Sequence, residues 1–237
     1  MTDDAARPHR VAVYYAPAPD SGWWSAGSHW LGRCAATGRA LTQPCPPGLS
    51  PHAFAQLTAE PRRYGWHATL KAPFQLAEGQ GLQQVRAALH QLCQQRSAFD
   101  LPALQACAMG SFLALRPVQP PAALEQLAAD CVRQLHPLAA PLGASELARR
   151  RRAGLTAEQD ALLLAWGYPW VLDHYRFHLS LTGTLHDQPA GCQAVLLDAA
   201  SRHFSGLGPC RIDRLSLFAE PTPGADFVLI EQMSFQP

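Results

Sequence analysis

Two short segments of the sequence share a pattern of residue types that could carry out acid–base chemistry. Residues 64–70 read YGWHATL and residues 175–181 read YRFHLSL. Each segment places a tyrosine three residues before a histidine, an aromatic residue one before it, a hydroxyl side chain two after it and a leucine three after it. The histidines, His67 and His178, are separated by nearly half of the 237-residue chain. Such a repeat indicates an internal duplication.

We expect both segments to be β-strands, because polar and apolar residues alternate along them. Side chains two positions apart on a strand point to the same side, and the intervening ones point to the other. His67 should therefore point with Thr69 and Lys71, and His178 should point with Ser180. If the two strands belong to related lobes, the two pairs of histidine and hydroxyl face each other across one cleft.

This arrangement suits attack on a phosphodiester. One neutral imidazole can remove a proton from water while the other, as imidazolium, donates a proton to the leaving oxygen. The hydroxyls of Thr69 and Ser180 can donate hydrogen bonds to the non-bridging oxygens, where charge develops, and Lys71 can bring positive charge to the phosphate. Either histidine could be the base, because the repeat is nearly symmetric. The scheme requires no metal and no cofactor, and no carboxylates with the spacing of metal ligands accompany the histidines.

The occurrence of the pattern twice is what makes it specific. A histidine followed two positions later by serine or threonine is a weak signal, and His203 with Ser205 also satisfies it. That third match lies at the expected end of a helix and has no tyrosine three positions before the histidine. A lone match is more often a surface or core histidine, whereas two matches that agree at every position of the pattern favour a functional site.

Strands and helices alternate in two rounds along the chain, which indicates an α+β fold. The expected strands cover residues 10–16, 66–74, 175–182, 215–219 and 227–233, with two more within 101–116. The expected helices cover residues 82–96, 121–136, 156–166 and 190–203. Residues 137–157 are interpreted as an inserted connection. We therefore predict one bilobal domain over residues 1–237, with pseudo-symmetric sheet-plus-helix lobes at approximately 8–118 and 119–237 around a central cleft.

The composition is that of an ordinary globular protein. The net charge is +1, with 48% of residues hydrophobic and 16% charged, so any phosphate must be attracted by local charge rather than by a global field. The seven cysteines include no Cys-x-x-Cys pair, which argues against a structural zinc site. No signal-like segment and no apolar stretch of membrane-spanning length is seen, so we expect no membrane association, a cytoplasmic location and a monomer.

The two histidine segments resemble the signature of the two-histidine (2H) phosphoesterase superfamily, in which a His-x-Thr/Ser motif occurs once per lobe. Further stretches are similar to a bacterial branch of that superfamily, a domain of unknown function often named a phosphonate metabolism protein. These stretches are WLGR (30–33), RRYGWHATLKAPF (62–74), GSFLAL (110–115), ELARRRRAGLT (146–156), WGYPWV (166–171) and FHLSLTG (177–183).

The resemblance implies a bilobal 2H phosphoesterase-like fold and hydrolysis or ligation at 2′,3′-cyclic or 2′,5′ phosphodiesters. It implies catalytic roles for His67, Thr69, His178 and Ser180, although the second motif has serine where threonine is common. The phosphonate association suggests a cyclic ribosyl phosphate. We therefore expect a cyclic phosphodiesterase, a phosphoric diester hydrolase, whose small phosphorylated substrate is a 2′,3′-cyclic nucleotide or a ribose cyclic phosphate.

Four other residues are weaker candidates for binding the substrate. Tyr64 and Tyr175 begin the two segments, where a place in a core or at the strand entry is at least as good an interpretation. Arg62 and Arg176 flank the segments, and one of them could reach the phosphate, but arginines at strand ends are usually solvated.

Two further features have no assigned role. The run Arg149–Arg152 fits a solvated helix better than an RNA-binding surface, because no aromatic residues are interleaved with it; a lid over the phosphate is the alternative. The tryptophans Trp23, Trp24 and Trp30 either cover a core or stack on a base or sugar.

Two alternative functions stay open at this point. An RNA end-processing or ligase-like 2H enzyme would need a groove for several nucleotides and would bind single-stranded RNA in a salt-dependent way. A non-catalytic protein that binds a phosphorylated metabolite would be stabilised by its ligand without turnover. The second alternative does not explain why two titrating groups are present.

Overall fold

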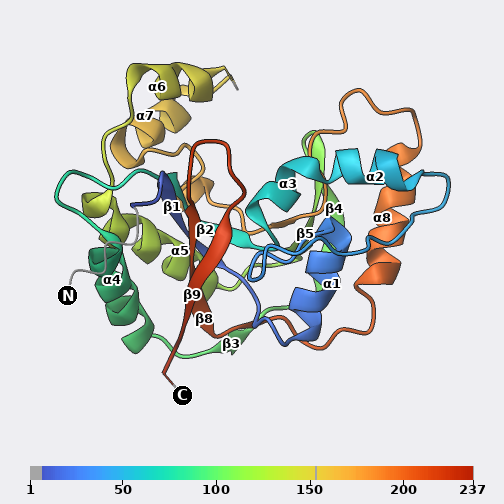
Figure 1. Ribbon diagram of the computed structural model, residues 1–237, viewed down its shortest axis with the longest axis horizontal. Coiled ribbons are helices and arrows are strands. Elements are labelled where there is room, and N and C mark those ends of the chain that lie inside the picture. Colours follow the sequence, from blue (N-terminus) through green and yellow to red (C-terminus); the bar gives the residue numbers. More distant parts are fainter. Residues whose placement is uncertain (1–6, 153, 237) are drawn as a thin grey trace.

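The computed structural model describes residues 7–152 and 154–236, over which the chain forms an α+β fold (Figure 1). The strands are β1 (Arg10–Tyr15), β2 (Ala68–Phe74), β3 (Phe99–Asp100), β4 (Leu104–Met109), β5 (Phe112–Pro117), β6 (Leu179–Ser180), β7 (Arg211–Ile212), β8 (Arg214–Glu220) and β9 (Val228–Ser234). The α-helices are α1 (Gly22–Leu31), α2 (Pro51–Leu57), α3 (Ala59–Tyr64), α4 (Leu82–Gln94), α5 (Ala122–Leu135), α6 (Ala144–Arg151), α7 (Ala157–Trp166) and α8 (Cys192–His203). Two 3₁₀ helices are η1 (His136–Leu138) and η2 (Leu172–His174). The predicted α+β class is confirmed.

The described strands form two antiparallel sheets and one small pair. The larger sheet has the order β2-β1-β8-β9, the smaller has the order β4-β5-β6, and β3 pairs with β7. Each sheet combines strands from both halves of the sequence, since β8 and β9 join β1 and β2, and β6 joins β4 and β5. The two sheets therefore do not follow the expected division into residues 8–118 and 119–237, because strands that are distant in the sequence pair with each other.

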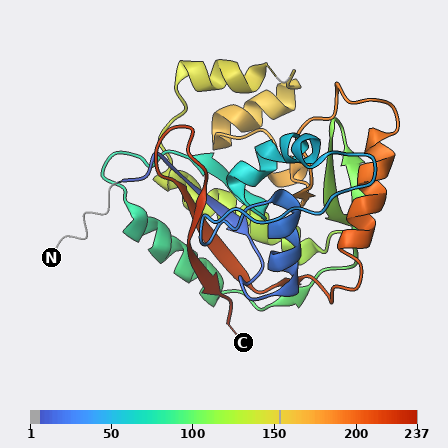
Figure 2. The ribbon, with the colours of Figure 1, turned by 45° about the vertical axis from the view of Figure 1, so that its right-hand side comes forward.

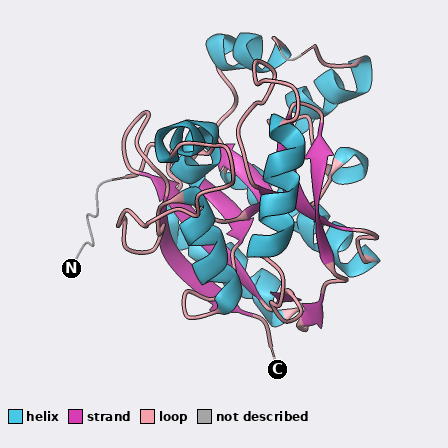
Figure 3. Cartoon of the chain, turned by 90° about the vertical axis from the view of Figure 1, so that its right-hand side faces the viewer, coloured by secondary structure: helices cyan, strands magenta, loops and turns pink. Residues whose placement is uncertain are grey.

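Helices α4 and α5 each pack on the larger sheet through one apolar face. In α4, Val85, Leu89 and Leu92 are buried, and in α5 the buried residues include Leu124 and Leu127, as the helical periodicity predicts. α5 packs against β2 and α4, and α4 also packs against β8 and β9. α8 lies along the smaller sheet, beside β4 (Figure 2). Figure 3 shows the molecule from the right-hand side of Figure 1, where helices lie in front of the strands.

One hydrophobic core joins the two sheets. Its buried members include Val11 and Val13 of β1, Leu113 and Leu115 of β5, and Leu179 of β6. Burial of apolar side chains is the main favourable term in folding. Because this core is shared, it holds the two sheets in a fixed relative position.

The second histidine segment forms much less strand than predicted. Within the expected strand 175–182, only the two residues of β6 form strand pairs with a neighbour, β5, and the Leu181 amide adds one hydrogen bond to the Leu113 carbonyl oxygen. Before it, the chain passes through η2, where Leu172 has a left-handed φ of 53°. After it, the indole Nε1 of Trp30 donates a hydrogen bond of 2.8 Å to the Leu181 carbonyl oxygen. A side chain from α1 therefore holds the segment where strand pairing ends.

The first histidine segment follows two short helices, α2 and α3, that the sequence analysis did not predict. Ser50 caps α2 by accepting a hydrogen bond from the Ala53 amide, and Pro51 occupies the first turn, where its missing N–H costs nothing.

The expected connection at 137–157 contains η1 and α6, and α6 stacks with α7 at the top of Figure 1. None of the helices described here has the length and apolarity required to cross a membrane.

Candidate active site

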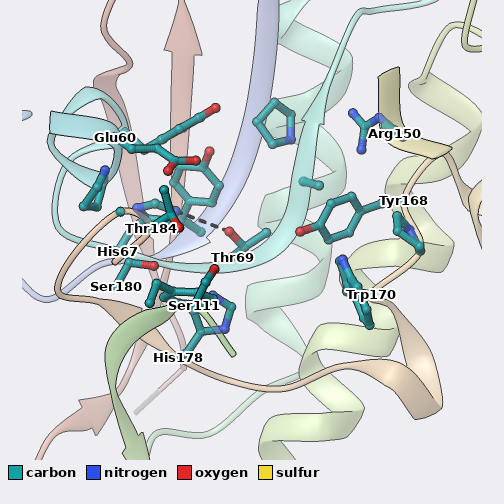
Figure 4. Close-up of a pocket in the computed structure, with 18 of the residues that line it drawn as sticks. Glu60, His67, Thr69, Ser111, Arg150, Tyr168, Trp170, His178, Ser180 and Thr184 are labelled. Atoms are coloured by element: carbon teal, nitrogen blue, oxygen red, sulfur yellow. Dashed lines mark hydrogen bonds between the residues drawn. The ribbon is translucent and has the colours of Figure 1, made fainter. Parts of the chain in front are cut away.

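A cavity of about 550 Å³ lies where β2 of the larger sheet faces β6 of the smaller one. Its wall includes His67 and Thr69 on one side and His178 and Ser180 on the other (Figure 4). The volume lies within the range of about 300–1,000 Å³ that is usual for small-molecule sites. Two segments far apart in the sequence therefore contribute their histidine and hydroxyl pairs to one cavity.

His67 is oriented by a hydrogen bond and by a stacked tyrosine. Its Nδ1 lies 2.9 Å from the Gly65 carbonyl oxygen, which can only accept, so Nδ1 carries the proton and donates. Its Nε2 lies 3.3 Å from Thr69 Oγ1. Its ring stacks on Tyr14 of β1, with the centroids 3.8 Å apart. The neutral ring therefore presents an unprotonated Nε2 beside the Thr69 hydroxyl.

The turn at Gly65 makes this orientation possible. Gly65 has φ of 81°, in the left-handed region that favours glycine. A Cβ at this position would lie only 2.5 Å from the Cβ of Ala35. Both the backbone conformation and the close approach of Ala35 therefore require glycine two residues before His67.

His178 repeats the arrangement in different surroundings. Its Nδ1 lies 2.7 Å from the Arg176 carbonyl oxygen, again the carbonyl two residues earlier, so Nε2 is again the unprotonated nitrogen of the neutral ring. Its aromatic neighbour is Phe112, whose centroid is 5.6 Å away at an interplanar angle of 57°. This contact is looser than the stacking of His67 on Tyr14. The two imidazoles therefore have the same tautomer but different aromatic neighbours.

Both histidines are neutral near pH 7. Desolvation by the surrounding protein lowers the pKa of His67 to about 4; the Gly65 carbonyl opposes this change and the charge of His178 adds to it. Desolvation also lowers the pKa of His178, opposed by the Arg176 carbonyl and assisted by the charge of Arg116. Because the charge of His178 acts on His67, the two rings lie within electrostatic reach of each other.

Further hydroxyl side chains line the cavity beyond the two predicted ones. Ser111, Thr182 and Thr184 contribute to its wall together with Ser180. The Thr182 hydroxyl accepts a hydrogen bond of 3.0 Å from the Leu113 amide. The sequence held a signal for two of them, because Thr182 and Thr184 continue the two-residue alternation that starts at Ser180.

Lys71 does not line this cavity, in contrast to the expectation that it points with His67 and Thr69. It lies in the wall of a neighbouring cavity of about 350 Å³, and its Nζ donates a hydrogen bond of 3.3 Å to the Trp166 carbonyl oxygen. The reason is an irregularity in β2, where Val13 of β1 pairs with Lys71 and the next residue pairs with Thr69. An extra residue at this bulge breaks the two-residue alternation. Burial lowers the pKa of Lys71 to about 8.

Among the other candidate binding residues, Tyr64 lines the cavity, from the end of α3. Arg62 is not part of its described wall and donates a hydrogen bond to the Ala55 carbonyl oxygen. Tyr175 and Arg176 line a different cavity, of about 660 Å³, whose wall also includes Thr69 and His178. The structure therefore brings one of these four residues to the shared cavity of the two histidines.

The three tryptophans near the N-terminus pack within the fold and do not line the cavity. Trp24 and Trp30 are buried, and Trp23 donates a hydrogen bond to the Gly208 carbonyl oxygen and stacks on Phe204. None of them is part of the described wall of the cavity. Of the two interpretations of these residues, packing in the core is the one that the structure supports.

The cavity is also lined by residues that the sequence analysis did not assign to it. Tyr168 and Trp170 lie in its wall, as do Arg149 and Arg150 of α6 and Arg10 of β1. The arginine run was visible in the sequence, but its contact with the cavity depends on how α6 is placed. Within residues 7–152 and 154–236, no three histidine, cysteine, aspartate or glutamate side chains are grouped so that they could hold a metal ion.

Solved structures with a similar overall path of the chain include a phosphoesterase and the E. coli protein LigT. The phosphoesterase is 14% identical, with 97% of this chain and 99% of that chain covered and a TM-score of 0.44. LigT complexed with phosphate is 12% identical, with 98% and 100% covered and a TM-score of 0.46.

Two curated relatives, both named ribose 1,5-bisphosphate phosphokinase PhnN, are more similar in sequence. The one from Janthinobacterium sp. (strain Marseille) is 41% identical over 229 residues, which are 95% of this chain and 51% of the relative. The one from Laribacter hongkongensis (strain HLHK9) is 40% identical over 222 residues, which are 93% of this chain and 50% of the relative. The chain thus spans about half the length of these relatives.

A family described as protein of unknown function (DUF1045) matches residues 69–228. The match covers more than half of the chain and includes the smaller sheet β4-β5-β6, β8 and all of β2 except Ala68. The expectation from the sequence of a domain of unknown function is confirmed, and the chain belongs to the DUF1045 family.

Proposed function

We propose that the protein is a metal-independent phosphoesterase that hydrolyses a small cyclic phosphodiester. The observation that carries the proposal is the shared cavity, into which His67 and His178 bring two imidazoles of the same tautomer. Each imidazole has a hydroxyl two residues later, Thr69 or Ser180, in the same wall. Two proton-transfer groups and two hydrogen-bond donors around one small cavity can support hydrolysis of a phosphodiester by general acid–base catalysis.

We assign the base role to His67 and the acid role to His178. A pKa of about 4 keeps the His67 ring neutral, so its Nε2 can accept a proton from water. The negative charge of a bound phosphodiester raises the pKa of both rings, and the His178 ring, which is less tightly stacked on aromatic neighbours, is then the one that takes the proton. The two groups thereby divide the acid and base roles by environment.

The reaction balances without a further reactant. The water oxygen forms a bond to phosphorus as its proton moves to His67 Nε2. The bond between phosphorus and the leaving ring oxygen breaks, and His178 Nε2–H donates a proton to that oxygen. The products are a phosphomonoester and a free hydroxyl on the same molecule. Thr69 and Ser180 donate hydrogen bonds to the non-bridging oxygens during this step.

The name of the curated relatives supports a ribose phosphate as the substrate class. They are named for a kinase that acts on ribose 1,5-bisphosphate, and opening a ribose cyclic phosphate yields a ribose phosphate monoester. We do not extend the kinase activity itself to this chain. Its sole lysine, Lys71, follows a leucine, whereas a P-loop lysine follows a glycine. A ribose cyclic phosphate is therefore the first substrate to test and a 2′,3′-cyclic nucleotide the second.

Phosphorus NMR in the presence of EDTA tests the proposal. The wild-type protein is incubated with ribose 1,2- and 2,3-cyclic phosphates and with 2′,3′-cyclic nucleotides. We expect the resonance of at least one cyclic diester to be replaced by that of a phosphomonoester at an undiminished rate after chelation. Absence of conversion with all of these diesters, or conversion that stops when EDTA is added, would contradict the proposal.

A further inference from the structure

The arginine run at the end of α6 is divided between two environments. Arg149 and Arg150 line the cavity that contains the histidines. Arg151 instead forms a two-point ion pair with Asp160 of α7, through hydrogen bonds of 2.6 and 2.8 Å. The run therefore supplies both the ion pair between α6 and α7 and two of the guanidinium groups on the cavity.

The two arginines on the cavity share one carboxylate. Arg149 donates hydrogen bonds of 2.9 and 2.6 Å to the two Glu146 oxygens, and Arg150 donates one of 3.0 Å to Oε1. The hydrogen bond with Arg149 is the largest cause that lowers the pKa of Glu146, to about 2. Two guanidinium groups against one carboxylate leave an excess of one positive charge.

Arg150 is held in place on the cavity wall. Its side chain is 11% exposed, and its guanidinium lies 5.4 Å from the centroid of the Tyr168 ring, where a cation is attracted by the ring. A long side chain that is already ordered loses little further freedom when it binds a ligand. Arg150 is therefore arranged for recognition of an anion.

A second pair of arginines adjoins the first. Arg10 of β1 and Arg63 both donate hydrogen bonds to Glu220, whose side chain is fully buried. Burial works against the charged form of Arg10, yet the hydrogen bond to Glu220 and the charges of Tyr64 and Glu146 raise its pKa. Arg10 lies in the same cavity wall as Arg149 and Arg150, so the two clusters border one cavity. Together, these described clusters contain four guanidinium groups and two carboxylates.

The guanidinium group of Arg150 lies at one end of the cavity, away from the histidines. In Figure 4, Arg150 is on one side, His67 and His178 are on the other, and Thr69 and Tyr168 lie between them. The charged residue labelled near the histidine end is Glu60, an acid. In the described wall, the guanidinium groups belong to Arg10, Arg149 and Arg150.

We propose that Arg10, Arg149 and Arg150, with Tyr64 and Tyr168, form a subsite for a second phosphate group of the same substrate. Guanidinium groups match the geometry of phosphate oxygens and bind them through paired hydrogen bonds. With the cyclic diester at the histidines, as the proposed function requires, the substrate is a sugar cyclic phosphate that also carries a phosphomonoester. The arginine end therefore selects for a bisphosphorylated sugar.

Isothermal titration calorimetry of the full chain with ribose 5-phosphate and with ribose 1,5-bisphosphate tests the subsite. Hydrogen bonds to charged groups contribute enough for a preference of about 10- to 100-fold for the bisphosphate. Arg150→Gln should bring the ratio of the two dissociation constants close to one. Arg149→Gln, at a more exposed position, should lower the ratio in the same direction. Arg202→Gln, at an exposed position of α8 outside the described cavity wall, is the control and should leave the ratio at the wild-type value.

Equal affinities of the wild-type protein for the two ligands would overturn the subsite, as would a preference that survives both Arg149→Gln and Arg150→Gln. Turnover is scored separately by phosphorus NMR with ribose 2,3-cyclic phosphate, with and without a 5-phosphate. Preferential binding without hydrolysis of either diester would reject the proposed function and retain the subsite. Hydrolysis of both diesters with equal kcat/KM would retain the function and reject the subsite.

Discussion

The two histidine segments agree in residue pattern but differ in the support that the fold gives them. The first runs into β2, a strand of seven residues in the four-stranded sheet, and His67 is the residue before that strand. The second has only the two paired residues of β6. Nevertheless, both histidines donate Nδ1–H to the carbonyl two residues earlier and leave the same nitrogen free. The geometry of each imidazole is therefore set by the local backbone and does not depend on the length of the strand.

The difference between the segments lies in what surrounds the rings. His67 stacks closely on Tyr14, whereas His178 has a looser contact with Phe112. Desolvation lowers the pKa of both rings, to about 4 for His67. A nearly symmetric motif can in this way supply an asymmetric acid and base pair.

The largest expected effect is that of removing either imidazole. His67→Ala and His178→Ala should each lower kcat on the best cyclic diester by about 10²- to 10⁴-fold, the usual range for general acid–base catalysis. His203→Ala, which removes the histidine of the third His-x-Ser match, should keep the wild-type kcat, because His203 is outside the described cavity wall. Wild-type turnover in either of the first two variants would reject the assignment of both rings.

The hydroxyl partners should matter next. Thr69→Val and Ser180→Ala each remove one donor to the phosphoryl oxygens and should lower kcat by about 10²-fold. Thr69→Ser and Ser180→Thr keep the hydroxyl and should retain most of the activity. If the conservative and the hydroxyl-free variants lost activity equally, the hydroxyls would have a packing role only. Comparison of the two positions shows whether the segments contribute equally.

The pH dependence should be that of two histidines with lowered pKa values. The reaction needs one ring neutral and the other protonated, and kcat/KM reports the free protein. Since the pKa of His67 is about 4 and that of His178 is below its ordinary value of 6.5, kcat/KM should be greatest below pH 6.5. Above that pH it should fall about tenfold per unit as the protonated acid is lost. A plateau that extends to pH 8 would contradict this account.

The smallest expected effect is on stability, at the position two residues before each histidine. Gly65→Ala places a Cβ at positive φ and 2.5 Å from Ala35, and we expect a loss of about 2–4 kcal/mol in the free energy of unfolding. Arg176→Ala is the matched change in the second segment, where the side chain is exposed, and should cost less than about 0.5 kcal/mol. Urea denaturation measures both. Equal losses would show that the two turns are equivalent.

The sequence was sufficient for features that depend on local periodicity. The buried faces of α4 and α5 agree with the helical spacing of their apolar side chains, and β1 lies within the expected strand 10–16. The repeat likewise identified the two pairs of histidine and hydroxyl that meet at the cavity. Each of these signals is contained in a few neighbouring residues.

The features that were missed depend on contacts between distant residues. The bulge that directs the Lys71 side chain toward the neighbouring cavity exists only in the pairing of β2 with β1. The mixed origin of the two sheets reflects long-range strand pairing, and the division of the arginine run depends on the ion pair between Arg151 and Asp160. No short window of sequence contains these contacts.

The central claim is that His67 and His178 both act in the reaction at one phosphorus atom. A crystal structure of the protein soaked with inorganic phosphate tests this claim most directly. We predict one phosphate with Nε2 of His67 and Nε2 of His178 each at about 3 Å from its oxygens, and with the Thr69 and Ser180 hydroxyls on the remaining oxygens. A phosphate in the cavity that contacts only one imidazole, with the other ring beyond its reach, would contradict the account.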